Sequence, residues 1–182
     1  MTQPAAPESI FTYGAPAVKF GDGASDEIGY DLAQLGARRA LVITDVGVAA
    51  TGVPARVAGQ MARYEVQATV FDGVRIEPTD ASMQAAIDWA REHGPFDAFV
   101  AVGGGSSIDT AKAVNLLLTN PGELIDYVNK PVGGGRSPVN ALHPLVAVPT
   151  TTGTGSESTT VCVLDVVTPL RVAEPVTPPR IL

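Results

Sequence analysis

Apolar residues follow two alternating patterns along the chain: short continuous runs, and longer stretches with apolar positions three or four apart. The runs contain β-branched residues and few polar ones, as in strands buried on both faces of a sheet. The spaced stretches match one face of a helix. The runs predict strands at residues 16–24, 40–45, 66–74, 97–104, 144–149 and 157–165. The spaced stretches predict helices at residues 25–36, 54–64 and 79–94, and after the glycines at 103–105.

The helix at residues 79–94 has the clearest boundaries. Thr79 can cap its N-terminus, Met83 and Ile87 share one face, and Gly94 is placed to end it. Because strands alternate with helices, the sequence predicts an α/β fold: a Rossmann-like parallel sheet with helices on both faces.

The domain organisation follows from where these patterns stop. Residues 1–165 are expected to form one domain, and residues 166–182, with four prolines and no usable period, an irregular Pro-rich tail. Residues 129–144 form a long Gly/Pro-rich loop that we expect to be mobile.

Composition excludes several classes of protein. Hydrophobic residues make up 45% of the 182 residues and charged residues 17%, which is too apolar for a disordered chain. The net charge of -7 and the lack of a basic stretch argue against nucleic acid or a membrane surface as partner. Cys162 is the single cysteine, so no disulfide framework is expected. With no targeting or membrane-spanning pattern, we expect a cytoplasmic protein.

The first candidate site is a glycine turn between a buried strand and a helix. Gly103, Gly104 and Gly105 lie at a strand's carboxyl end, where parallel sheets bind ligands. Free amides and the helix dipole favour an anion there, and Ser106 can cap the helix or donate to a phosphate oxygen. A tight turn without a ligand remains the alternative.

Two further strand ends carry polar groups suited to a nucleotide. Residues 149–157 supply four threonine hydroxyls and two glycines, which suit ribose and pyrophosphate oxygens. Asp45 ends another strand, where a carboxylate can bind both adenosine ribose hydroxyls and repel a 2′-phosphate, so it predicts NAD over NADP. A helix N-cap explains Asp45 equally well.

The remaining polar residues are ambiguous. Asp109 and Lys112 share a helix face, either as a surface ion pair or near the nicotinamide end of the site. His93 and His143 are isolated, and a metal site needs several convergent ligands, so we interpret both as structural or surface residues.

Two motifs, GGGSSIDTAKAVNLL and AVPTTTGTGSE, together resemble the N-terminal half of the iron-containing (group III) alcohol dehydrogenases. The segments FDGVRIEPTDAS and LIDYVNKPVGGG are most similar to the hydroxyacid-oxoacid transhydrogenase branch. The similarity spans about residues 13–165, and the tail after Asp165 does not resemble the family's continuation.

The resemblance implies a domain that binds NAD(P), followed by a helical domain holding Fe²⁺ or Zn²⁺. It places the pyrophosphate on Gly103–Ser106 and the ribose and phosphates near Thr150, Thr151 and Thr154. It also matches Asp45 to the adenosine ribose and Asp109 to the nicotinamide end. The family's metal ligands, one Asp and three His of the helical domain, have no counterpart in this chain.

Three hypotheses follow. The first is an NAD-dependent, metal-assisted oxidoreductase of alcohols or hydroxyacids such as 4-hydroxybutyrate, represented by its cofactor half. The second is a non-catalytic dinucleotide-binding module. The third is a relative in the direction of dehydroquinate synthase or glycerol dehydrogenase, with zinc. We expect the isolated chain to bind NAD weakly without turnover, and to self-associate through apolar surface.

Overall fold

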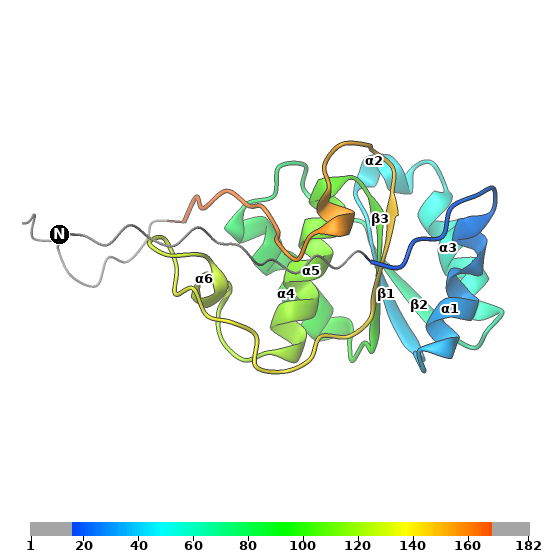
Figure 1. The fold of residues 1–182 in the computed structure, drawn as a ribbon, viewed down its shortest axis with the longest axis horizontal. Helices are drawn as coiled ribbons and strands as arrows, with labels where there is room; N and C mark the ends of the chain where they lie inside the picture. The colour runs from blue at the N-terminus through cyan, green and yellow to red at the C-terminus, as the bar shows by residue number, and fades with distance from the viewer. Residues whose placement is uncertain (1–15, 169–182) are drawn as a thin grey trace, which may run out of the picture.

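Four parallel strands form the centre of the molecule, in the order β2-β1-β3-β4 (Figure 1). The computed structural model describes residues 16–168. The strands are β1 (Arg39–Ile43), β2 (Gln67–Phe71), β3 (Ala98–Gly103) and β4 (Leu145–Pro149). The predicted α/β fold with a parallel sheet is therefore confirmed.

Helices cover both faces of this sheet, giving three layers (Figure 1). The helices α1 (Ile28–Gln34) and α3 (Val53–Ala62) pack on one face, and α4 (Asp80–His93) and α5 (Gly105–Thr119) on the other. Shorter elements connect them: α2 (Val46–Ala49), α6 (Leu124–Tyr127), and the 3-10 turns η1 (Ala24–Glu27) and η2 (Ser156–Ser158). No helix within residues 16–168 is long and apolar enough to cross a membrane.

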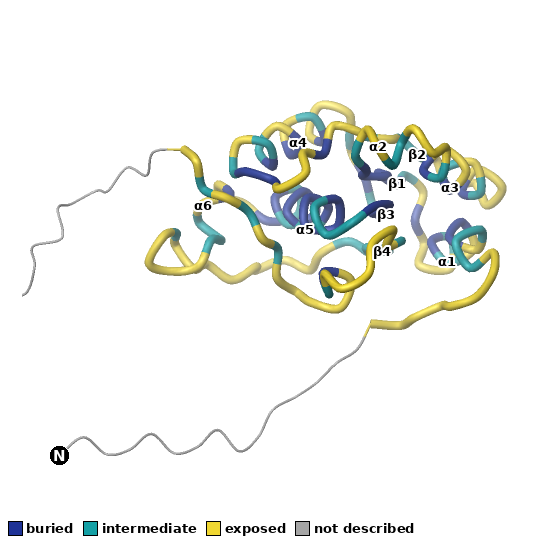
Figure 2. The backbone as a smooth tube through the Cα atoms, turned by 90° about the horizontal axis from the view of Figure 1, so that it is seen from above, coloured by how far each residue is buried: buried dark blue, intermediate teal, exposed yellow. Residues whose placement is uncertain are grey.

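The two central strands are buried on both sides, as their continuous apolar runs predict. Every residue of β3 is buried, and its side chains alternate between two clusters. Phe99 and Ala101 pack with α4 and α5, whereas Val100 and Val102 pack with α1 and α3. Figure 2 shows the same pattern, with α5 and the central strands dark blue and the outer loops yellow. The carboxyl ends of β1 and β3 are thereby fixed by the best-packed part of the molecule.

Two predicted strands are wrong. Residues 16–20 have no regular structure, residues 21–23 form a bend and a turn, and η1 begins at Ala24; Val18 and Phe20 are exposed. Lys19 in this segment instead binds Glu27 and Asp31. A strand pattern requires a neighbouring strand edge, and within the described residues this segment has none.

Residues 157–165 also form no strand, because side chains of α5 bind the backbone groups that a sheet would use. Lys112 Nζ donates to the Val161 carbonyl at 2.6 Å, and the Val163 amide donates to Asp109 Oδ2 at 3.0 Å. Within the described residues, the β-type pairing of this segment is limited to one isolated parallel bridge between Thr79 and Asp165.

The Gly/Pro-rich loop at residues 129–144 contains no helix or strand, but its glycines fit closely around α6. Backbone amides of Gly134, Gly135 and Arg136 donate to carbonyls of Ile125, Val128 and Asp126. A Cβ on Gly134 would lie 2.7 Å from the Asp126 carbonyl oxygen. The expected mobility of this loop stays a prediction.

Candidate functional site

The predicted site residues meet at the point where the strand order reverses. From β1 the chain crosses to β2 on one side, and from β3 it crosses to β4 on the other. The carboxyl ends of β1 and β3 are therefore neighbours at a topological switch point, where open α/β sheets bind ligands. Asp45 follows β1, the glycines end β3, and the threonine loop follows β4. Three separate sequence segments thus come together at one edge of the sheet.

The helix behind the glycine turn begins without a side-chain cap. Gly104 is the N-cap of α5, and its carbonyl accepts from the amides of Ser107 and Ile108 at 3.1 and 3.2 Å. Within residues 16–168, the amides of Gly105 and Ser106 make no hydrogen bond. Free amides at a helix N-terminus form an anion site, because the dipole and the donors act together.

The glycines allow the threonine loop to contact the turn directly. A Cβ on Gly104 would lie 3.0 Å from Thr151 Oγ1, and one on Gly105 would lie 3.2 Å from Thr154 Cβ. The Thr150 amide donates to the Gly103 carbonyl at 3.0 Å, which joins the two loops. The space beside Gly104 that the sequence assigns to phosphate is thus partly held by Thr151.

Two hydroxyls beneath the turn have no hydrogen-bond partner among the described residues. Thr44 is 0% exposed and Ser107 1% exposed, and the Oγ atoms of both are buried and unpaired. Ser107 packs against Gly103 so closely that a Cβ on Gly103 would overlap the Ser107 hydroxyl. Buried hydroxyls are normally satisfied, so their position at the switch point is consistent with a polar ligand or water there.

Asp45 takes one of the two roles that its position in the sequence allows, the helix N-cap, and its binding of the adenosine ribose stays a prediction. Its Oδ1 accepts from the Val48 amide at 3.0 Å and so caps α2. Its Oδ2 lies 3.6 Å from the position that a Cβ of Gly103 would take, so it faces the glycine turn. The cap fixes the carboxylate, and the second oxygen remains available to a ribose hydroxyl.

Ser106 connects the turn to the segment between β2 and α4. Its hydroxyl oxygen accepts from the Glu77 amide at 3.3 Å. That bond occupies a lone pair of Ser106 Oγ and leaves its proton free to donate. Ser106 therefore does not cap α5, whose N-cap is Gly104, and donation from its hydroxyl to a phosphate oxygen stays a prediction.

Asp109 and Lys112 are not an exposed surface pair. Asp109 is 5% exposed; its Oδ1 lies 3.4 Å from Lys112 Nζ, and its Oδ2 binds the Val163 amide. The pair anchors residues 159–163 to α5, one turn beyond the glycines. Burial raises the pKa of the nearby Cys162 thiol, and the Asp109 charge raises it further. The assignment of Asp109 to the nicotinamide end stays a prediction.

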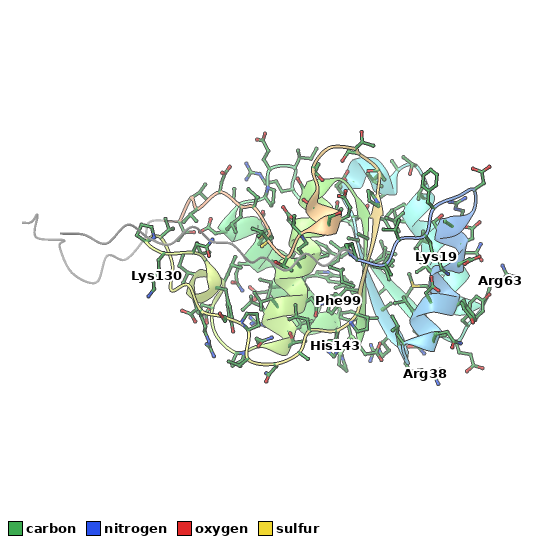
Figure 3. The ribbon with its side chains drawn as sticks, in the orientation of Figure 1. Lys19, Arg38, Arg63, Phe99, Lys130 and His143 are labelled. Atoms are coloured by element: carbon green, nitrogen blue, oxygen red, sulfur yellow. The ribbon has the colours of Figure 1, made fainter. Side chains whose placement is uncertain are left out.

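The two histidines have structural contacts. His93 Nδ1 lies 2.8 Å from the Trp89 carbonyl, and its ring stacks on Trp89. His143 lies beside Phe99 (Figure 3), and its backbone exchanges two hydrogen bonds with the Asn115 side chain. No group of three or more potential metal ligands occurs within residues 16–168. The described residues therefore do not fit a resident metal ion.

Sequence reasoning missed the residues that support the turn from below. Thr44, Ser107 and Ser156 are buried at the ends of the same strands and loops, and Ser156 Oγ faces Gly105. A small hydroxyl residue beside a predicted strand end was the available signal. It was missed because the motif residues next to each of them had stronger patterns.

Comparison with known proteins identifies the family. The family model for iron-containing alcohol dehydrogenase matches residues 15–176, which extends the similarity past Asp165, where the motifs predict its end. Hydroxyacid-oxoacid transhydrogenase from Xenopus tropicalis, a mitochondrial protein, is 43% identical over 159 residues, which are 87% of this chain and 34% of that protein. The human protein of the same name is 42% identical over 157 residues. The chain spans about a third of the length of these relatives.

Solved structures agree with this match. The structure of a 1,3-propanediol oxidoreductase has a TM-score of 0.76 at 33% identity, covering 87% of this chain and 40% of that one. Sulfoacetaldehyde reductase from Bifidobacterium kashiwanohense, solved in complex with NAD⁺, has a TM-score of 0.74 at 28% identity, covering 85% and 40%. The fold, the motifs and these relatives together show that the chain belongs to the iron-containing alcohol dehydrogenase family.

Proposed function

We propose that this chain is the NAD-binding half of a metal-assisted oxidoreductase that acts on alcohols or hydroxyacids of the 4-hydroxybutyrate type. One observation carries the proposal: the uncapped N-terminus of α5 faces Asp45 at the switch point. Free amides suit a diphosphate, and the nearby carboxylate suits a ribose diol. A relative at 28% identity was solved with NAD⁺, which supports the same ligand here.

Each residue at the edge of the sheet has a role in this proposal. The amides of Gly105 and Ser106 and the Ser106 hydroxyl bind the diphosphate. Thr150, Thr151 and Thr154 contact ribose and phosphate oxygens from the facing loop, and Asp45 holds the adenosine ribose. Asp109 lies toward the nicotinamide. When bound, the coenzyme would accept or give the hydride, while these residues bind and orient it.

The proposal for the coenzyme does not extend to a metal ion. The family name includes iron, but the described residues hold no ligand set for it. The described residues therefore supply no catalytic step that uses a metal. The missing ligand set is the observation that favours the second candidate, a dinucleotide-binding module without catalysis of its own.

Calorimetric titration with NAD and NADP, together with an activity assay, tests the proposal. We expect NAD to bind, inorganic diphosphate to compete, and NADP to bind more weakly. We expect no oxidation of 4-hydroxybutyrate with NAD and added Fe²⁺ or Zn²⁺. Turnover under these conditions would exclude the module, and absence of NAD binding would overturn both candidates.

The substrate class rests on the names of the relatives, which describe hydroxyacid-oxoacid transhydrogenases. Those names place the relatives in mitochondria, whereas the sequence predicts a cytoplasmic protein here, so the compartment stays a prediction. Purification of the chain from fractionated cells of its source would decide between the two locations.

A further inference from the structure

The segment between β2 and α4, residues 72–79, crosses the edge of the sheet where the candidate coenzyme site lies. Near its start, the Val74 amide donates to the Thr44 carbonyl at 3.3 Å, directly after β1. Near its end, the Glu77 amide donates to Ser106 Oγ at 3.3 Å, in the first turn of α5. The two residues between these bonds therefore lie between the end of β1 and the uncapped N-terminus of α5.

The backbone of this segment is strained beside the site. Glu77 has a φ of 54°, in the left-handed region that residues with a side chain rarely adopt. Such a conformation costs free energy and persists only where surrounding contacts hold it, most often at functional sites. The bond between the Glu77 amide and Ser106 is one such contact, so the segment is held against the start of α5.

Buried hydroxyls without a partner lie at both ends of this crossing. Thr44, whose carbonyl accepts from Val74, is 0% exposed, and Ser107, directly after Ser106, is 1% exposed. Among the described residues, neither Thr44 Oγ1 nor Ser107 Oγ has a hydrogen-bond partner. Because buried hydroxyls are normally paired, both ends of the crossing point to a polar ligand or water at this edge.

Four segments of the chain converge at this edge, and together they contain one cationic side chain, that of Arg75. The segments are residues 44–45, 72–79, 103–107 and 150–157. Their acidic side chains are Asp45, Asp72, Glu77 and Glu157. A diphosphate bound here would be repelled by these carboxylates, and the amides of α5 offer only partial positive charge. A full positive charge at the same edge would therefore strengthen its binding.

The Arg75 side chain is available for this role. It is exposed, and it forms no ion pair within residues 16–168. Its neighbour Val74 is buried among the residues packed with α4 and α5, which fixes the backbone from which Arg75 projects. Two residues separate Arg75 from Glu77, so their Cα atoms are at most about 7.6 Å apart. A long arginine side chain can reach the first turn of α5 from there, and its planar fork matches phosphate oxygens.

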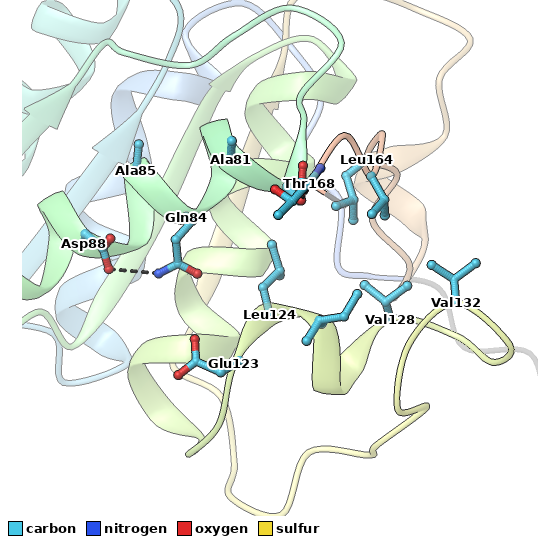
Figure 4. A pocket seen from close by; sticks show the side chains of 13 residues that line it. Ala81, Gln84, Ala85, Asp88, Glu123, Leu124, Val128, Val132, Leu164 and Thr168 are labelled. Atoms are coloured by element: carbon cyan, nitrogen blue, oxygen red, sulfur yellow. Dashed lines mark hydrogen bonds between the residues drawn. The ribbon is translucent and has the colours of Figure 1, made fainter. Parts of the chain in front are cut away.

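The groove between α4 and α6 offers no comparable place for an anion (Figure 4). Its volume is about 760 Å³, and no lysine or arginine is among its lining residues. Its acidic groups are already bound: the Asp80 carboxylate accepts from the amides of Val167 and Thr168, and Asp88 pairs with Arg91. The unpaired arginine is instead at the carboxyl edge of the sheet.

We propose that Arg75 binds the diphosphate of the coenzyme, together with the free amides of Gly105 and Ser106. This inference rests on the proposed function and adds to it a charged residue that neither the glycine turn nor the threonine loop contains. Arg75 then binds the phosphates shared by NAD and NADP, whereas Asp45 distinguishes the two coenzymes at the ribose.

Calorimetric titration of the full chain with NAD tests the proposal. We expect Arg75→Gln, which keeps most of the side-chain length, to bind NAD about tenfold more weakly at low ionic strength. The difference should shrink as salt screens the charge, and Arg75→Lys should bind with intermediate affinity because it keeps the charge and loses the fork. Arg63→Gln is the matched control with the same change in net charge. Arg63 is the C-cap of α3 just before β2, at the opposite edge of the sheet, and its affinity should equal that of the wild type (Figure 3).

Two further ligands identify the group that Arg75 binds. Inorganic diphosphate should compete with NAD less well in Arg75→Gln, and the ratio of the NAD and NADP dissociation constants should stay as in the wild type. A loss confined to NADP would overturn the proposal, because Arg75 would then bind the 2′-phosphate. Equal NAD affinities of the wild type and Arg75→Gln would overturn it too and leave the proposed function standing, whereas a wild-type chain that binds no NAD would overturn both.

Discussion

The helices α4 and α5 lie side by side on one face of the sheet, yet their N-termini are built in opposite ways. At α4, Thr79 Oγ1 accepts from the Ser82 amide, and Ser82 Oγ accepts from the Thr79 amide, so a complete capping box closes the helix. At α5, the N-cap is Gly104, and no side chain among the described residues caps it. The same backbone groups are satisfied internally in one helix and left open in the other.

The two N-termini therefore serve different purposes: that of α4 contributes to stability, and that of α5 is open to a ligand. A capping box contributes roughly 1 kcal/mol to folding, so α5 forgoes stabilisation that a single serine or aspartate could supply. The deep burial of α5 compensates, because Ile108, Ala111 and Val114 are almost fully enclosed. A helix held by its core contacts can leave its first amides for a ligand.

Gly104→Val is expected to have the largest effect on the uncapped N-terminus of α5. The new side chain would start 3.0 Å from Thr151 Oγ1 and displace the threonine loop. Overpacking of this kind costs about 1–3 kcal/mol, and a cost of that size in the bound geometry corresponds to roughly 5- to 150-fold in affinity. Calorimetry should show NAD binding weakened by a factor in this range in a protein that still folds. Gly59→Val, with nothing within 4 Å of its Cβ position, is the matched control, and equal affinities for the two variants would contradict the proposed site.

Asp45→Asn tests whether the Asp45 carboxylate binds the adenosine ribose. The amide oxygen can still accept from the Val48 amide, so α2 keeps its cap, while the negative charge is lost. Bonds to a charged group contribute about 1.5–3 kcal/mol, so we expect NAD affinity to fall about tenfold and the preference over NADP to narrow. An unchanged ratio of the two dissociation constants would remove Asp45 from the site.

Thr79→Ala removes the side-chain cap of α4 and should leave the N-terminus of α5 unchanged. The Ser82 amide loses its acceptor, at a cost of about 1 kcal/mol in the free energy of unfolding. Urea denaturation measures this loss, and calorimetry should find NAD affinity unchanged. A parallel loss of affinity would show that the two helix ends are not independent.

Asp80→Asn is expected to have the smallest effect, and one that depends on pH. Hydrogen bonds from Thr168 and from the Val167 and Thr168 amides lower the pKa of Asp80 in the folded protein. Because the pKa of Asp80 is lower in the folded than in the unfolded protein, its carboxylate stabilises the folded protein at any pH above the unfolded pKa. That contribution is lost as pH falls through the folded pKa. Thermal unfolding should therefore separate variant from wild type at neutral pH, and the difference should shrink as pH falls through the folded pKa of Asp80. A constant difference across this range would contradict the assignment.

Much of the fold was predictable because the central strands and α4 carry strong local signals. The run at β3 is apolar at every position, and Thr79 and Gly94 mark both ends of α4. The failures at residues 16–24 and 157–165 share a cause: β-branched composition favours a strand, but pairing depends on distant groups. At residues 161 and 163 the side chains of Lys112 and Asp109 took those bonds, which no local pattern reveals.

The candidate site was predictable in its members but not in its packing. Glycines, threonines and Asp45 at strand ends indicated one edge of the sheet, and the sheet order brings them together. The contact of Thr151 with Gly104, and the buried hydroxyls of Thr44 and Ser107, depend on how the loops fold over one another. Such contacts between distant segments leave little trace in a single sequence.

The bond from the Thr150 amide to the Gly103 carbonyl continues the β3–β4 ladder one step beyond the strands. The two loops at this edge are therefore held in place by the sheet even when no ligand is bound. A binding partner would not have to spend free energy on ordering them. In hydrogen-exchange measurements on the empty protein, the Thr150 amide should exchange as slowly as those of β4, although it lies in a loop.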